Sequence, residues 1–171
     1  IWSLTQGGFS NWEALRAEFL PRMEQAEQDN DPIAFEFAMR DFSWSIPDGH
    51  VGVFPNSTAL DDDFFTNTDG GLGMSLTEFD DGRIVITYLT PGGPAEQADL
   101  GLLTEVTAIN GEPIDDVVNA TVPYSSPFSS DINRRLQQLR YAIRFPLNTD
   151  VEVTVLNDAG EEETIQMTTV A

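Results

Sequence analysis

Apolar residues in the first part of the chain recur every three or four positions, which is the period of an amphipathic helix. The pattern runs over residues 10–46 and is interrupted only around residues 28–32. There, Asp31 can cap a new helix and Pro32 can occupy its first position. We therefore predict two successive helices, with Pro21 denting or splitting the first of them.

From residue 71 onward the apolar positions alternate, which indicates β-strands. Two alternating segments, 71–79 and 83–89, flank Asp80-Asp81-Gly82, a sequence typical of a hairpin turn. Because short strands joined by tight turns run antiparallel, we expect an antiparallel sheet. Further strands are predicted over residues 103–109, 151–155 and 164–170.

Two helices are predicted among these strands. A short one over residues 95–100 follows a Pro-Gly-Gly-Pro turn, and a long one covers residues 130–145. The predicted fold class is α+β, with an N-terminal helical segment followed by an antiparallel β-sandwich or partly open barrel that carries the two helices. The long helix has one apolar face, formed by Ile132, Leu136, Leu139 and Ile143.

Residues 55–68 separate the two regions and are rich in polar side chains. The consecutive aspartates Asp61 to Asp63 invite a calcium interpretation, but the two phenylalanines that follow break the ligand spacing of a calcium loop. We therefore expect a solvated acidic linker and no metal site. The expected organisation is a helical region at 1–54, the linker at 55–68 and a second domain at 69–171.

Charge and composition exclude several classes of function. The 171 residues include 8 basic and 29 acidic side chains, for a formal net charge of −21, and every basic residue is arginine. Such an acidic surface repels phosphate backbones, so no nucleic-acid partner is expected. No apolar run approaches the roughly 18 residues that a membrane span needs, so we expect no membrane insertion. The absence of cysteine excludes thiol catalysis, and no cofactor is expected.

The most informative segment is a glycine-rich bend at residues 71–76 that runs directly into a strand. Glycine lets consecutive backbone N–H groups converge into a concavity that binds anions. If the strand has an open edge, an extended peptide can add beside it and place its terminal carboxylate in that concavity. The other interpretation is that Gly71 and Gly73 only permit a tight turn or a bulge. An edge already paired on both sides would exclude the peptide.

A longer stretch of sequence resembles a PDZ domain of the bacterial kind. It reads GGLGMSL and then DGRIVITYLTPGGPAEQADLGLLTEVTAINGEPI, and the resemblance covers about residues 69–170. One departure is Thr104-Glu105, where such domains usually have Gly-Asp before the third strand. The resemblance implies a groove for the C-terminal tail or an unfolded segment of a protein substrate. Its carboxylate loop would be Leu72, Gly73 and Met74, with side-chain contacts from Leu76, Leu136 and Leu139.

His50, the only histidine, lies in the sequence IPDGHVGV directly after the predicted helices. A lone histidine beside a turn is usually a structural residue. However, a helical segment that ends in this motif before a PDZ domain resembles the front part of carboxyl-terminal processing peptidases and their tricorn-core relatives. In a tricorn-like arrangement, the resemblance implies that His50 is the general base for a serine beyond Ala171. In the other known arrangement, a Ser–Lys dyad lies wholly downstream.

The resemblance implies that the chain recruits substrates for a serine-type peptidase whose catalytic core is absent from it, so that the chain alone is inactive. Two alternatives stay open: a non-catalytic adaptor that binds peptides, and a structural spacer whose groove is closed. The acidic surface predicts a preference for apolar, uncharged or basic tails. The composition fits an extracellular, periplasmic or cell-envelope location, and the sequence defines no oligomeric state.

Overall fold

A computed structural model describes residues 12–171, so the predicted beginning of the first helix, at residue 10, lies outside the described residues. The chain divides into two compact units. One contains the described residues up to Asp63 together with Ser125–Arg134, and the other contains Phe64–Tyr124 and Arg135–Ala171. The segment 125–134, which we expected in the second domain, groups with the N-terminal helices.

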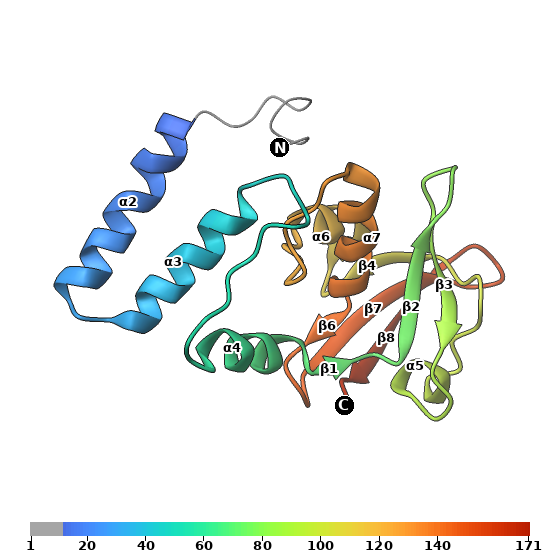
Figure 1. The fold of residues 1–171 in the computed structure, drawn as a ribbon. Coiled ribbons are helices and arrows are strands. Elements are labelled where there is room, and N and C mark those ends of the chain that lie inside the picture. Colours follow the sequence, from blue (N-terminus) through green and yellow to red (C-terminus); the bar gives the residue numbers. More distant parts are fainter. Residues whose placement is uncertain (1–11) are drawn as a thin grey trace. The chain divides into compact units, whose positions relative to one another are not determined.

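The N-terminal unit is built on helices α2 (Trp12–Gln28) and α3 (Pro32–Trp44), which lie side by side as a hairpin (Figure 1). Pro21 lies inside α2 without splitting it. Asp31 caps α3 as predicted, because one of its carboxylate oxygens accepts hydrogen bonds from the N–H groups of the second and third helical residues, at 3.0 and 2.9 Å.

Ring contacts and ion pairs hold this helical hairpin together. Phe19 of α2 meets Phe42 of α3 edge to face, with 5.7 Å between the ring centroids. Arg22 of α2 pairs with Asp41 of α3 at 2.6 Å. On α3, the Arg40 guanidinium pairs with Asp41 at 2.9 Å and with Asp63 at 2.8 Å. Because Asp63 belongs to the next helix along the chain, Arg40 links that helix to α3.

Most of the predicted acidic linker is helical. Residues that we expected to form a loop make up helix α4 (Ala59–Thr68). Asp61 and Asp62 lie in its first turn, where the positive end of the helix dipole favours carboxylates. At the other end, the Thr68 hydroxyl donates to the Phe64 carbonyl at 2.8 Å. The polar composition that we interpreted as a loop is therefore that of a helix N-terminus.

The second unit contains short strands that pair antiparallel throughout. The predicted Asp80-Asp81-Gly82 turn joins β2 to β3, with Gly82 at a φ of 88°. Hydrogen bonds from the Arg83 backbone N–H and from its guanidinium hold the pKa of Asp81 below its usual range. The strands are β1 (Gly70–Gly71), β2 (Met74–Glu78), β3 (Ile84–Leu89), β4 (Val106–Ile109), β5 (Glu112–Pro113), β6 (Arg144–Phe145), β7 (Asp150–Leu156) and β8 (Glu162–Thr168).

These strands form a partly open barrel. The largest sheet has the order β5-β4-β7-β8, while β2 pairs with β3 and β1 pairs with β6. Single bridges join the sheets: Val85 of β3 pairs with Glu105, and Gly71 of β1 pairs with Val170. Thr104-Glu105, the departure from the PDZ pattern, thus lies at this join through its backbone and away from the glycine bend. The predicted α+β fold class is confirmed.

Three helices accompany the strands: α5 (Pro94–Gln97), α6 (Ile114–Ala120) and α7 (Asp131–Tyr141). The short α5 matches the predicted short helix, whereas α6 was not predicted. Helix α7 ends at Tyr141 and not at residue 145, because the residues that follow pair as β6 with β1. The core lies between the sheets and α7, and its most buried members include Val85, Ile86, Val151 and Val153.

Candidate functional site

Strand β2 has an open edge. Among the described residues it pairs with one strand, β3, from Met74 opposite Leu89 to Glu78 opposite Ile84. Strand β3, in contrast, is bonded on both edges, since the Ile86 N–H also donates to the Thr104 carbonyl at 2.9 Å. The outer edge of β2 is thus available to a further strand, as the addition of a peptide requires.

The backbone of β2 presents hydrogen-bonding groups to that edge. At the end of the strand, the Phe79 N–H donates to the Arg83 carbonyl at 2.8 Å. This bond makes Glu78 and Ile84 a non-bonded pair. Because bonded and non-bonded pairs alternate along an antiparallel ladder, Leu76 and Ile86, two positions further on, also form a non-bonded pair. The Ile86 carbonyl accordingly accepts from Leu103 on its other edge, at 2.8 Å. The N–H and C=O groups of Leu76 therefore point outward, where a guest strand would pair.

The bend before β2 has free N–H groups. The carbonyls of Leu72 and Gly73 accept hydrogen bonds from Ala95 at 2.9 Å and from Thr90 at 2.7 Å. The Gly73 N–H donates to no other residue in the described part of the chain, and Met74 turns its N–H outward because it forms a non-bonded pair with Leu89. The Leu72 N–H faces β6 instead, since Gly71 uses its own N–H and C=O to bond Val170. Gly73 has a φ of 70°, and a Cβ there would lie 3.0 Å from the Cα of Gly93. The bend is thus tightly packed on its carbonyl side and open on its amide side, as an anion-binding loop requires.

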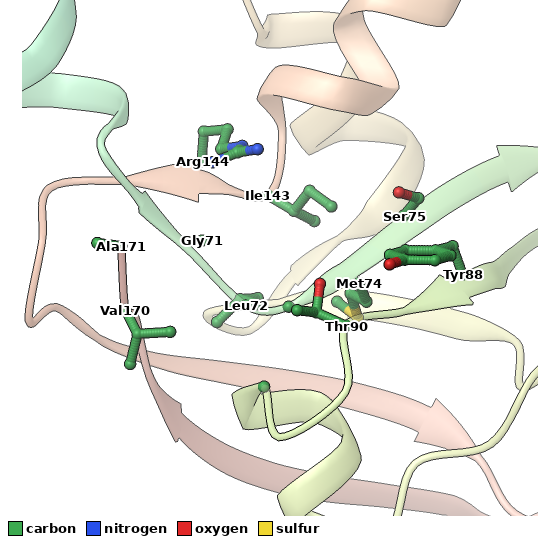
Figure 2. Close-up of a pocket in the computed structure, with 12 residues that line it drawn as sticks. Gly71, Leu72, Met74, Ser75, Tyr88, Thr90, Ile143, Arg144, Val170 and Ala171 are labelled. Carbon is green, nitrogen blue, oxygen red and sulfur yellow. The ribbon is translucent and has the colours of Figure 1, made fainter.

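A pocket of about 250 Å³ lies at this bend. Leu72, Gly73 and Met74 line it from the bend and the start of β2, and Tyr88 lines it from β3. Arg144 lines the pocket from β6, the strand beside Gly71 (Figure 2). The lining therefore joins free backbone amides, apolar side chains and one guanidinium.

The structure brings together three of the six predicted groove residues, because Leu72, Gly73 and Met74 line this pocket. The other three do not line it. Leu76 and Leu139, at 8% and 2% exposure, belong to the hydrophobic core, while Leu136 on α7 is 53% exposed. Their contacts with a peptide stay a prediction.

Arg135 fixes α7 against its neighbours. Its guanidinium donates to Glu78 at the end of β2 at 2.5 Å, and to Asp115 and Asn119 of α6, each at 2.9 Å. The hydrogen bond to Glu78 is the main cause that raises the pKa of Arg135, against the opposing effect of its partial burial. This guanidinium therefore stays charged and holds α7 at a set position beside β2.

Several residues of the pocket were missed by the sequence analysis. Ser75, Tyr88 and Thr90 line it from β2 and from the end of β3. The predicted hairpin places Ser75 and Tyr88 opposite each other, so its register could have indicated them. Arg144 could not have been found in this way, because the same local pattern assigned it to a helix.

His50 lies in a tight turn after α3. The Asp48 carboxylate accepts from the His50 backbone N–H at 3.0 Å, and the same oxygen lies 2.9 Å from Nδ1 of the imidazole. The turn is also held by Ser129, whose hydroxyl oxygen accepts from the Gly49 N–H at 2.9 Å. The imidazole is 95% exposed, while Asp48 is largely covered.

The contact with Asp48 orients the imidazole. Since a carboxylate only accepts hydrogen bonds, the contact with Asp48 places the proton of the neutral ring on Nδ1 and leaves Nε2 as a base. An Asp–His contact of this kind also occurs in hydrolytic triads, so the role of His50 as a general base stays a prediction. No serine or threonine hydroxyl bonds to the imidazole within residues 12–171.

The fold and the groove define a PDZ-like module that follows a helical region and a histidine turn. Among solved structures, an S499A mutant of CPAF aligns with 98% of this chain and 29% of that chain, at 12% identity and a TM-score of 0.63. Mature CPAF aligns with 94% of this chain and 31% of that chain, at 13% identity and a TM-score of 0.58. At these identities the likeness shows the fold alone, and at that level the predicted resemblance is confirmed.

The chain spans under a third of the CPAF chains that it matches. The PDZ domain of a carboxy-terminal protease from Vibrio cholerae, solved in complex with peptide, aligns with 59% of this chain and 93% of that chain. Its identity is 23% and its TM-score is 0.38. No family model matches the sequence, and neither does any curated protein. No helix in the described part of the chain is long and apolar enough to cross a membrane.

Proposed function

We propose that this chain is the substrate-recruiting part of a serine peptidase. Residues 69–171 bind the C-terminal tail of a protein substrate, and a catalytic core beyond residue 171 cleaves that substrate. The chain alone is inactive. The observation that carries the proposal is the unpaired outer edge of β2, which begins at a bend with free amide groups. An edge strand with such an end is what strand addition by a peptide with a terminal carboxylate requires.

The recruiting role is tested by peptide titration. We expect a ten-residue peptide with an apolar C-terminal residue to bind the 171-residue chain more tightly as the free acid than as the C-terminal amide. The reason is that the amide removes the charge that the bend would bind. Fluorescence anisotropy with an N-terminally labelled peptide measures both affinities. Equal, weak binding by the two forms would support the closed spacer and overturn the proposal.

The tail preferred by the groove follows from the charge of the chain. A net charge of −21 repels acidic residues upstream of the ligand's terminus, so apolar, uncharged or basic tails bind better than acidic ones. A glutamate-rich tail that bound best would contradict this. The acidic, lysine-free composition also supports an extracellular, periplasmic or cell-envelope location, which we include in the proposal.

His50 is proposed as the general base of the whole enzyme, with Asp48 as the residue that orients it. In a protein that extends beyond residue 171 to the core, His50→Gln is expected to lower kcat by a factor of roughly 10² to 10⁴. Peptide binding to the groove should be unchanged, because His50 does not line the pocket. Full activity in this variant would favour a Ser–Lys dyad in the core and would remove His50 from the mechanism.

A non-catalytic adaptor is the second candidate. It is favoured by the exposed imidazole, which contacts Asp48 but no hydroxyl in residues 12–171. The adaptor predicts that the sequence beyond residue 171 lacks a serine with a lysine or glutamate partner, and that the longer protein binds tails without cutting them. Cleavage of a bound tail by the longer protein would exclude it.

A further inference from the structure

Arg144 occupies a special place at the pocket. It lies on β6 directly opposite Gly71 of β1, so a backbone pairing fixes its position. Its side chain lies close to this glycine, since a Cβ at Gly71 would lie 3.3 Å from the guanidinium Nη1. The absence of a side chain at Gly71 thus leaves room for the guanidinium beside the bend that carries the free amides.

The guanidinium has no acidic partner of its own. The chain has 29 acidic residues, and Arg22, Arg40, Arg83 and Arg135 all pair with one or more of them. Arg144 makes no ion pair with any residue of the described chain, and no ring lies under it there. Arg16, Arg134 and Arg140 also form no ion pair within residues 12–171, but none of them lines the pocket, so Arg144 is the cation that makes the pocket locally positive.

The edges of β1 determine what can reach this position. On one edge β1 pairs with β6. On the other, the N–H and C=O of Gly71 bond to Val170 at 2.8 and 3.1 Å. A strand added to β2 therefore cannot continue past Gly71. Because a guest antiparallel to β2 has its C-terminal end beside Met74, the guest must stop at the pocket that Arg144 lines.

We propose that Arg144 forms an ion pair with the terminal carboxylate of a bound tail, together with the free amides of the bend, and so selects chain ends over internal segments. This inference rests on the proposed function, and it adds to that function a charged residue from β6. A carboxylate could also come from an aspartate side chain in an internal segment. We propose the chain end because both edges of β1 are already paired, so a guest strand must end at the pocket and cannot continue past it.

The test uses the 171-residue chain and three forms of one apolar ten-residue peptide: the free acid, the amide, and an amide whose last residue is aspartate. Binding is measured for the wild type, Arg144→Gln, Arg144→Lys and the matched control Arg140→Gln. Arg140 lies on α7 over the Tyr141 ring and does not line the pocket, and its loss changes the net charge equally. Circular dichroism checks that each variant is folded.

We expect Arg144→Gln to weaken binding of the free acid by roughly five- to tenfold, as for a charged hydrogen bond that is partly open to solvent. Binding of the amide should change by less than about twofold, because the amide has no charge for Arg144 to pair with. Arg144→Lys should retain part of the preference, since the charge remains but the planar fork is lost. Arg140→Gln should behave as the wild type, and added salt should reduce the wild-type preference.

The outcomes separate the two proposals. If the wild type binds none of the peptides, or binds acid and amide equally, the proposed recruiting function fails. If the wild type prefers the acid and Arg144→Gln keeps the full preference, recruitment stands and the role of Arg144 is overturned. If the C-terminally amidated peptide that ends in aspartate binds as well as the free acid, Arg144 binds any carboxylate. The selection of chain ends is then overturned.

Discussion

Gly73 shows how a single residue determines the geometry of the bend. Its φ of 70° lies in the left-handed region, which a side chain disfavours. Its carbonyl is held by Thr90, and a Cβ would meet Gly93 and Pro94 at 3.0 Å. Both constraints keep the carbonyls of the bend turned toward the protein, so that the amides remain on the ligand side.

The matched variants Gly73→Ala and Gly82→Ala separate the effect of the positive φ from the effect of close packing around a Cβ. Gly82 also has a positive φ, of 88°, but nothing lies within 4 Å of a Cβ placed there. We expect Gly82→Ala to cost about 1 kcal/mol in the free energy of unfolding, from the backbone alone. Gly73→Ala should cost about 1–3 kcal/mol more, because the rigid neighbours must also move. Urea denaturation measures both, and equal losses would show that packing at the bend is loose.

At the scale of elements, the strands and turns that local sequence determines were predicted well. Alternating residues and turns such as Asp80-Asp81-Gly82 place β2, β3, β7 and β8 close to their observed positions, because each signal lies within a few residues. The end of α7 was not predictable in this way. Residues 142–145 continue the helical period, but two of them form strand β6 because they pair with β1, which lies more than seventy residues earlier in the chain.

The candidate site divides in the same way. The glycine pattern is local, and it indicated the bend at Leu72 and Gly73 that runs into β2, while the open edge of β2 was left as a condition. Arg144 is brought to that bend by the pairing of β6 with β1, which no local pattern contains. Similarly, helix α4 was missed because aspartates favour both loops and helix N-termini, and only the rest of the structure decides between them.

Helix α7 is positioned by Arg135, and a double-mutant cycle measures this link. Both Arg135 and Glu78 are partly covered, at 24% and 31% side-chain exposure, whereas Asp115 is 62% exposed. We expect a coupling in the unfolding free energy of about 0.5–1 kcal/mol for Arg135→Gln with Glu78→Gln. The coupling with Asp115→Asn should be smaller, because solvent screens that pair. A larger coupling to Asp115 would mean that Arg135 fixes α7 to α6 more than to β2.

At the scale of the whole molecule, the dominant quantity is the net charge of −21. The paired arginines neutralise carboxylates only locally. The remaining acidic side chains repel one another more strongly in the compact state than in the unfolded chain. One concentration of them is the run Glu161-Glu162-Glu163, which is exposed where β8 begins. The chain is thus expected to gain stability whenever this repulsion is screened.

We expect the thermal midpoint of unfolding to rise as NaCl increases from about 20 to 300 mM, the range over which the Debye length falls from roughly 20 Å to below 8 Å. The double variant Glu162→Gln and Glu163→Gln should have a higher midpoint than the wild type at low salt, because it carries two fewer repelling charges. For the same reason its midpoint should rise less with salt. KCl should act as NaCl does, since screening depends on ionic strength and not on the ion. A midpoint that fell with salt would show that the ion pairs, such as those of Arg40 and Arg135, outweigh the repulsion among the acidic residues.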